Sequence, residues 1–108
     1  MARVLAVAPD LFFSSKIDAT LRAAGHEVEI VSSAPAGDIA ADVMIVDLDS
    51  AGTEVTGPPG VPRLGFYSHV DVETRLRAEK SGFDLVVPRS RMAREMPELV
   101  ASILERSA

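Results

Sequence analysis

The 108-residue chain contains no cysteine and no tryptophan, and only 5% of its residues are aromatic. Without cysteine there is no disulfide framework, thiol nucleophile or zinc–thiolate site. No apolar run is long enough to cross a membrane. The early run Val4–Ala8 is too short for a signal peptide and is followed at once by Pro9-Asp10. We therefore expect a cytoplasmic protein without a membrane partner, folded as a single domain over residues 1–108.

The charge of the chain is acidic overall but unevenly distributed. The formal net charge of −5 argues against nucleic-acid binding, which needs clustered lysine and arginine. Residues 1–54 carry three basic and nine acidic side chains, whereas residues 55–108 carry eight and seven. Solvated helix faces are the favoured explanation of the basic second half, and a docking surface is the alternative. The basic residues of the second half include Arg75, Arg77, Lys80, Arg89, Arg91 and Arg94.

One apolar run, Val43–Leu48, is the centre of the predicted fold. Four apolar residues lead directly into Asp47, and Asp49 follows two positions later. A short, unbroken apolar run predicts a strand that is covered on both faces. In a parallel sheet, side chains just past the carboxyl end of a central strand lie in the crevice where ligands bind. Asp47 is therefore the first candidate for a functional residue.

Strands and helices are expected to alternate along the chain. Ser14 or Ser15, with Asp18, resembles a capping box for the first helix, and Gly25 supplies its end. Of Phe12 and Phe13, we expect one in the core and one at the edge of the site. The predicted strands are residues 3–8, 27–31, 43–48, 63–67 and 84–87. The second of these strands is expected toward a sheet edge. The predicted helices are residues 15–24, residues 68–82 and the segment that begins at Pro97.

The second half of the chain supplies further helix signals. Ser68 with Asp71 is a second capping pattern. Val72 and Leu76 are expected on the inner side of the helix that follows, with Ala78 as a further candidate. Pro88 stops the fifth strand, and residues 90–95 are expected to form a single turn. Pro97 suits the first position of a helix, and Leu99, Val100, Ile103 and Leu104 then form an apolar stripe.

Two crossovers are expected to lack a long helix. Residues 34–41 contain Pro35 and Gly37, so that at most a short helix fits there. Residues 50–60 contain three glycines and two prolines, which makes a stable helix improbable and leaves one sheet face thinly covered. An exposed apolar patch there would indicate a partner. The alternation predicts an α/β, flavodoxin-like fold with a five-stranded parallel sheet in the order 2-1-3-4-5.

The chain resembles a response-regulator receiver domain over nearly its whole length. The likeness rests on Val4-Leu5-Ala6-Val7, Ala23-Ala24-Gly25-His26-Glu27-Val28, Ala41-Asp42-Val43-Met44-Ile45-Val46-Asp47-Leu48, Lys80-Ser81-Gly82-Phe83-Asp84 and Val86-Val87-Pro88-Arg89-Ser90. The third helix of that family is missing here or replaced by a loop. The resemblance implies a cytoplasmic signalling protein of the two-component phosphorelay type rather than an enzyme.

The resemblance also assigns positions to the family's phosphorylation site. Asp47 matches the phosphoacceptor aspartate, but Ala8 and Pro9 stand where the family has an acidic pair that holds Mg²⁺. Asp10 and Asp49 are the remaining candidates for a vestigial metal site with Asp47, but a turn cap is the favoured role of Asp10 and a solvent-facing position at the strand end that of Asp49. Tyr67 and Ser68 fall at the family's switch hydroxyl, and Arg89 falls at its phosphate-binding lysine.

Three functions follow from these positions. The first is a degenerate receiver, or pseudo-receiver, without cofactor, in which Asp47 is permanently paired with Arg89. It would bind a protein partner or a second copy through a surface carrying Arg75, Arg77, Arg91 and Arg94. The second is a working single-domain regulator phosphorylated on Asp47 with Mg²⁺, and the third is a small-ligand binder. His26 and His69 are too far apart in the sequence to predict a metal site.

Overall fold

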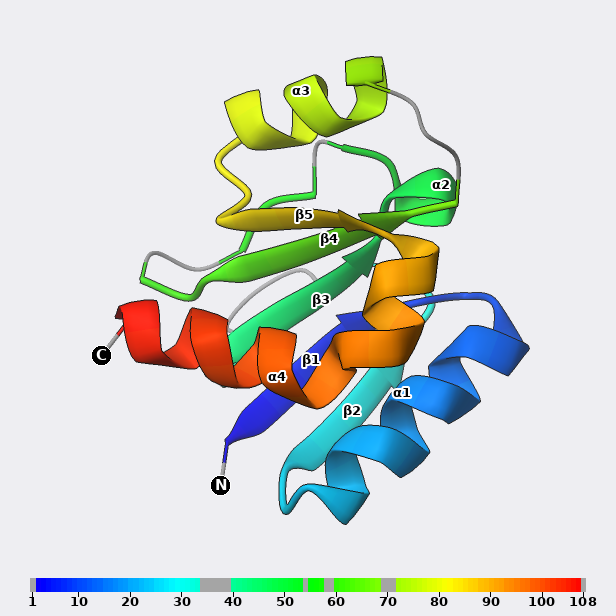
Figure 1. The fold of residues 1–108 in the computed structure, drawn as a ribbon, viewed down its shortest axis with the longest axis vertical. Coiled ribbons are helices and arrows are strands. Elements are labelled where there is room, and N and C mark those ends of the chain that lie inside the picture. Colours follow the sequence, from blue (N-terminus) through cyan, green and yellow to red (C-terminus); the bar gives the residue numbers. More distant parts are fainter. Residues whose placement is uncertain (1, 34–39, 54, 58–59, 69–71, 108) are drawn as a thin grey trace.

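The computed structural model describes residues 2–33, 40–53, 55–57, 60–68 and 72–107, which form a parallel sheet between two layers of helices (Figure 1). The strand order is β2-β1-β3-β4-β5, so the predicted flavodoxin-like topology is confirmed. The elements in chain order are β1 (Arg3–Val7), α1 (Leu11–Ala23), β2 (Glu27–Val31), β3 (Val43–Asp47), α2 (Leu48–Ala51), β4 (Arg63–Tyr67), α3 (Val72–Lys80), β5 (Leu85–Pro88) and α4 (Arg89–Ser107).

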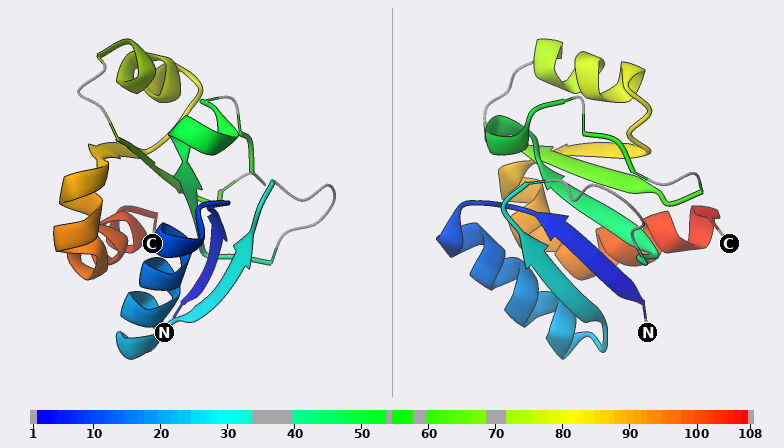
Figure 2. Two further views of the ribbon diagram at one scale, coloured as in Figure 1. Left: turned by 90° about the vertical axis from the view of Figure 1, so that its right-hand side faces the viewer. Right: turned by 180° about the vertical axis from the view of Figure 1, so that it is seen from behind.

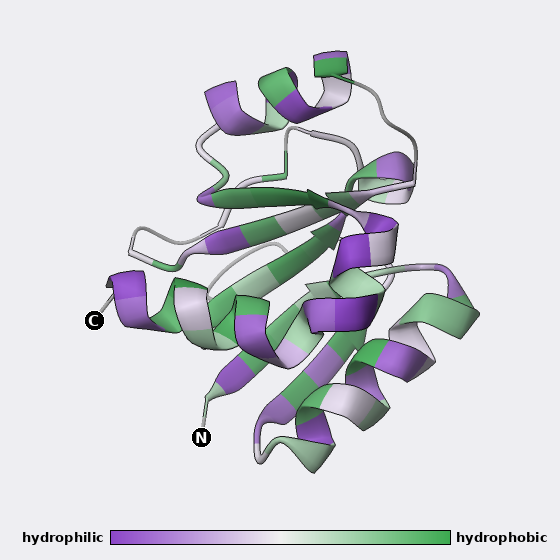
Figure 3. Ribbon diagram, in the orientation of Figure 1, coloured by the Kyte–Doolittle hydropathy of each residue, from purple (hydrophilic) through white to green (hydrophobic). Residues whose placement is uncertain are grey.

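The two faces of the sheet carry separate cores. Helices α1 and α4 cover one face and α2 and α3 the other, as the edge-on view in Figure 2 shows. Every residue of the central strand β3 is buried, whereas β2, at the sheet edge as expected, has exposed positions. In Figure 3, β3 is coloured hydrophobic along most of its length, whereas β2 alternates between hydrophobic and hydrophilic colouring. Residues 34–39, where a short helix was expected, lie outside the described residues.

Helix α1 begins earlier than the sequence predicted. Its N-cap is Asp10, whose side chain accepts a hydrogen bond from the backbone N–H of Phe12 at 3.0 Å. The predicted cap at Ser14 or Ser15 is wrong, since Ser14 is buried inside the helix and donates to the Leu11 carbonyl. Asp and Ser are equally good N-caps. With Asp10 as the cap, Phe13 lies inside the helix and stacks on Phe66 in the core. The predicted end at Gly25 is correct, with φ of 94°.

Helix α3 presents its apolar residues to solvent. Val72 and Leu76 are 61% and 53% exposed, so their predicted place on the inner side is wrong. Ala78 is instead the buried residue that faces the sheet. Residues two positions apart on a helix differ by about 200° around its axis, so a helix that buries Ala78 turns Leu76 outward. The cap expected from Ser68 and Asp71 involves residues 69–71, which lie outside the described residues.

The crossover after β3 is partly helical and covers the sheet better than expected. A single turn, α2, follows Asp47 directly, because the Asp47 side chain accepts from the Asp49 N–H and caps it. From Gly52 to Arg63 the described residues form no further helix. Within this crossover, Val55 and Val61 are partly buried against the core that contains Met44. On the same side of the sheet, Val72 and Leu76 of α3 are exposed.

Arg63 holds the crossover in place. Its guanidinium donates to the carbonyl of Val55 in the crossover and to that of Ser81 in the turn after α3. It also lies 4.7 Å from the ring centroid of Phe83. The Arg63 side chain, at the start of β4, therefore ties the irregular crossover after α2 to the turn after α3.

The last helical segment confirms the predicted break. The run Arg89–Ser107 is kinked at Glu95, whose φ and ψ of −121° and 21° are not helical. Pro97 follows in the first turn after the kink, where its missing N–H breaks no helical hydrogen bond. Leu99, Val100 and Ile103 are buried and Leu104 is partly buried, as the stripe predicted. None of the described helices is long and apolar enough to cross a membrane.

The Arg63 contacts lead to a stability prediction. Replacement of Arg63 by Met should lower the free energy of unfolding by about 1–3 kcal/mol, since two carbonyls lose a charged donor. Arg3→Met is the matched control, because Arg3 also opens a strand but only pairs with Glu27 at 3.2 Å in solvent. That variant should cost less than about 1 kcal/mol in urea-induced unfolding. Equal losses in the two variants would contradict the role given to Arg63.

Candidate functional site

Asp47 ends β3 at the carboxyl edge of the sheet and is completely buried, with 0% of its surface exposed. Along β3, Val43 and Ile45 face the side of α1 and α4, and the alternation of the strand places Asp47 on that side too. A buried carboxylate must be neutralised or hydrogen-bonded to be stable. The partners of Asp47 therefore define this site.

Both carboxylate oxygens of Asp47 are engaged. Oδ1 accepts from the backbone N–H of Asp49 at 3.2 Å. Oδ2 accepts from the Ser50 hydroxyl at 3.4 Å and from Nη2 of Arg89 at 3.2 Å. The carboxylate thus has a cap role toward α2 and an ion-pair role toward α4 at the same time.

Arg89 is the cation of the site and connects three strands. It is the first residue of α4 and follows β5 directly, and its Nη1 lies 3.4 Å from Oδ2 of Asp10, in the loop after β1. Its guanidinium also lies 4.7 Å from the ring centroid of Phe13 and 5.3 Å from that of Phe66. Its Nε is buried and has no hydrogen-bond partner within the described part of the chain. We define Asp10, Asp47 and Arg89 as the arginine clamp.

An aromatic floor supports the clamp. Phe13 and Phe66 stack with their centroids 4.6 Å apart and their planes at 21°. A planar guanidinium can stack on such rings, whereas the point charge of lysine cannot do so as well. The expectation of one core phenylalanine is correct for Phe13, whereas Phe12 is 91% exposed.

The other acidic candidate, Asp49, does not join Asp10 and Asp47 in a metal site. Its Oδ2 accepts from the backbone N–H of Ser68 at 2.6 Å, which ties α2 to the end of β4. Among the described residues, no group of three or more His, Asp or Glu side chains is placed to hold a metal ion. His26 accepts from the backbone N–H of Ala2 through Nδ1, and His69 lies outside the described residues.

The switch-equivalent residues lie apart from the clamp. Tyr67 is buried in the core on the α2/α3 side, whereas its neighbour Phe66 belongs to the core on the α1/α4 side. Ser68 is exposed and donates its backbone N–H to Asp49. No hydrogen bond joins either hydroxyl to Asp47 among those found for the described residues.

The four arginines predicted as a partner surface are paired with glutamates of their own helices. Arg75 lies 3.7 Å from Glu79, and Arg77 pairs with Glu73. On α4, Glu95 is 3.5 Å from Arg91 and 3.3 Å from Arg94. The surface is therefore close to neutral rather than basic.

Sequence reasoning missed three components of the site. These are the Ser50 contact, the Asp10–Arg89 contact and the stack of Phe13, Phe66 and Arg89. Asp10 and Arg89 are 79 positions apart, so no local spacing signals their contact. The available signal was topological, since residues that follow neighbouring parallel strands meet at one sheet edge.

Comparisons with known proteins place this geometry in a structural context. No protein-family model matches the sequence, and no curated protein matches it. Among solved structures, the CheY-like receiver domain protein of Methanospirillum hungatei superposes with a TM-score of 0.85 and 21% identity, over 99% of this chain and 96% of that one. The chain therefore has the fold of a receiver domain.

Two further structures have the same fold in different contexts. NtrX of Brucella abortus gives a TM-score of 0.83 at 20% identity over 98% of this chain, which spans only 27% of that protein. The ChxR receiver domain of Chlamydia trachomatis gives 0.72 at 17% identity, over 96% of each chain. Identities this low establish the shared fold and leave the function of this chain to its own residues.

The clamp predicts strong energetic coupling between its charged residues. Arg89→Met leaves the buried Asp47 carboxylate without its cation and should lower the free energy of unfolding by about 2–4 kcal/mol. In the Asp47→Asn background the same change should cost less, with a coupling energy of about 0.5–3 kcal/mol. Urea unfolding of the two single variants and the double variant measures this cycle. Additive losses would show that the ion pair does not stabilise the fold.

Proposed function

We propose that this chain is a receiver-type signalling domain of a two-component pathway that binds a protein partner without being phosphorylated. The single observation that carries the proposal is the arginine clamp, in which Arg89 lies 3.2 Å from the buried Asp47 and 3.4 Å from Asp10. The receiver fold supports the signalling context. The clamp supports the absence of phosphotransfer.

Phosphoryl transfer to Asp47 would need a cation and an accessible carboxylate oxygen. A divalent ion neutralises the charge that develops on a transferring phosphoryl group. The residues present do not fit Mg²⁺, because Ala8 and Pro9 offer no carboxylate and Asp10 is paired with the Arg89 guanidinium. Attack by Asp47 would also require one of its oxygens to leave a hydrogen-bonded, fully buried position.

The phosphorylation test is direct. After incubation with acetyl phosphate and Mg²⁺, intact mass spectrometry should show no phosphoryl adduct on the wild-type chain, because the Asp47 carboxylate is buried and paired with Arg89. An active receiver treated in parallel is the positive control. Amide spectra should also show no Mg²⁺-dependent change.

The opposite result would identify the alternative function. An adduct that forms on the wild type and is absent from Asp47→Ala would establish Asp47 as a phosphoacceptor and overturn the proposal. A small-ligand site beside Asp10 and Asp47 has less support, since Asp47 is fully buried and both carboxylates are already paired with Arg89.

The proposed partner surface is formed by the outer sides of α3, β5 and α4, at the β5 edge of the sheet, and we call it the α3/α4 face. Its arginines are Arg75, Arg77, Arg91 and Arg94, and its exposed apolar residues are Val72 and Leu76. Since each arginine is paired within its helix, the apolar pair on α3 supplies the binding area and the ion pairs of α3 border it. Apolar residues exposed one turn apart on a helix are suited to a protein partner.

The α3/α4 face can be tested with matched variants. Val72→Ser/Leu76→Ser should weaken partner binding at least tenfold, because it removes the exposed apolar contact. Leu11→Ser removes an exposed apolar side chain from α1 and should leave that binding unchanged. Affinity capture followed by titration of the captured protein measures both. A partner that binds both variants equally would contradict the choice of this face.

A further inference from the structure

An aromatic side chain projects from the first turn of α1. Phe12 is 91% exposed and its neighbour Leu11 is 79% exposed. The turn itself is fixed, because Asp10 accepts from the Phe12 N–H at 3.0 Å and lies 3.4 Å from Arg89, while Phe13 stacks on Phe66. An aromatic ring held on a rigid turn loses little conformational entropy when it binds.

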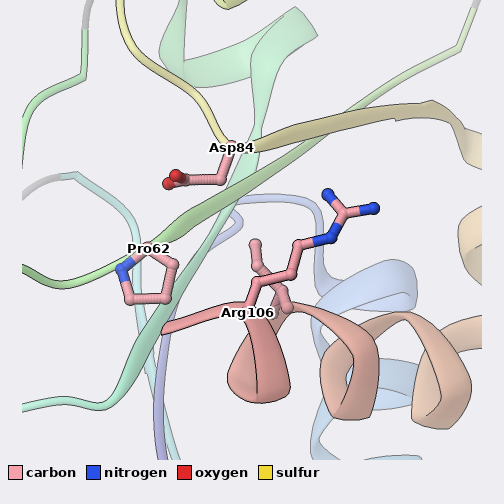
Figure 4. A pocket seen from close by; sticks show the side chains of 4 residues that line it. Pro62, Asp84 and Arg106 are labelled. Atoms are coloured by element: carbon pink, nitrogen blue, oxygen red, sulfur yellow. The ribbon is translucent and has the colours of Figure 1, made fainter. Parts of the chain in front are cut away.

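A small cavity lies at the other end of the sheet. Pro62, Asp84, Ile103 and Arg106 line a volume of about 140 Å³ where β4 begins and α4 ends. In Figure 4 the carboxylate of Asp84 and the guanidinium of Arg106 point away from each other, with Pro62 nearby. Elsewhere, an apolar cavity of about 150 Å³ binds benzene, so this volume suits one phenyl ring. We call it the amino-edge pocket.

The Phe12 ring and the pocket cannot meet within one molecule. Helix α1 begins at the carboxyl edge of the sheet, and the pocket lies at the amino edge, beside the end of α4 (Figure 1). A second copy, shifted by about one molecular length, can bring its Phe12 to the pocket.

The charges beside the two features are complementary. Asp10 precedes Phe12, and the exposed Lys16 follows one helical turn later on the same side of α1. The pocket carries Asp84 and Arg106 around its apolar walls. One orientation places Lys16 near Asp84 and Asp10 near Arg106, and the reverse orientation opposes like charges, so that the charges select one register.

We propose that the chain self-associates head to tail, with Phe12 of one copy inserted into the amino-edge pocket of the next. The contact is heterologous, so that each added copy leaves one free Phe12 and one free pocket. Sedimentation should therefore show an average mass that rises continuously with concentration and does not stop at a dimer. A single ring in a small pocket gives a small, weak interface.

Two surface variants isolate one such contact. Phe12→Ala keeps the pocket and lacks the ring, whereas Arg106→Glu keeps the ring and places a like charge beside Asp84 in its own pocket. Both positions are exposed, so both variants should fold. Isotope-labelled Phe12→Ala, titrated with unlabelled Arg106→Glu, should show amide shifts at Asp84, Ile103 and Arg106.

The control removes the ring from the titrant. Unlabelled Phe12→Ala/Arg106→Glu should produce no shifts at the pocket, and the apparent dissociation constant should weaken at least tenfold. Pocket shifts that depend on Phe12 would support the proposal. Equal shifts with both titrants, shifts confined to α3, or no shifts at all would overturn it.

Discussion

The buried ion pair between Asp47 and Arg89 is the interaction on which the carboxyl edge of this structure depends. Asp47 ends the central strand, and Arg89 begins the last helix. Their contact joins β3 to α4, and the second branch of the guanidinium reaches Asp10 at the start of α1. A fully buried carboxylate without this cation would be costly. Removing the positive charge of Arg89 would therefore destabilise the contacts among β3, α4 and the start of α1.

A second arginine has the same role at the other end of the sheet. Arg63 joins the irregular crossover to the turn after α3 and lies over Phe83, much as Arg89 lies over Phe13. Each guanidinium combines several hydrogen-bond donors with a flat surface for an aromatic ring, which lysine does not provide. The fold thus uses one planar cation at the irregular crossover after β3 and another beside the buried Asp47.

Much of the fold could be predicted because its signals are local. The apolar run ending at Asp47 and the glycine after α1 gave the parallel sheet and the end of the helix. The faces of the helices were predicted less well, since of the three residues expected on the inner side of α3 only Ala78 is buried, whereas Val72 and Leu76 are exposed. The N-cap of α1 was also missed, because Asp10 and Ser14 are both good caps and only tertiary packing selects one.

The sequence by itself determined the strand order, the place of Asp47 at a sheet edge and the absence of carboxylates at Ala8 and Pro9, because these follow from apolar runs and residue identity. Tertiary structure decided the contacts of that edge. Arg89 meets Asp10 only because β1 and β5 end at the same side of the sheet, and it lies on Phe13 only because α1 and α4 share one face. Such contacts depend on distances across the folded chain, which no local spacing encodes.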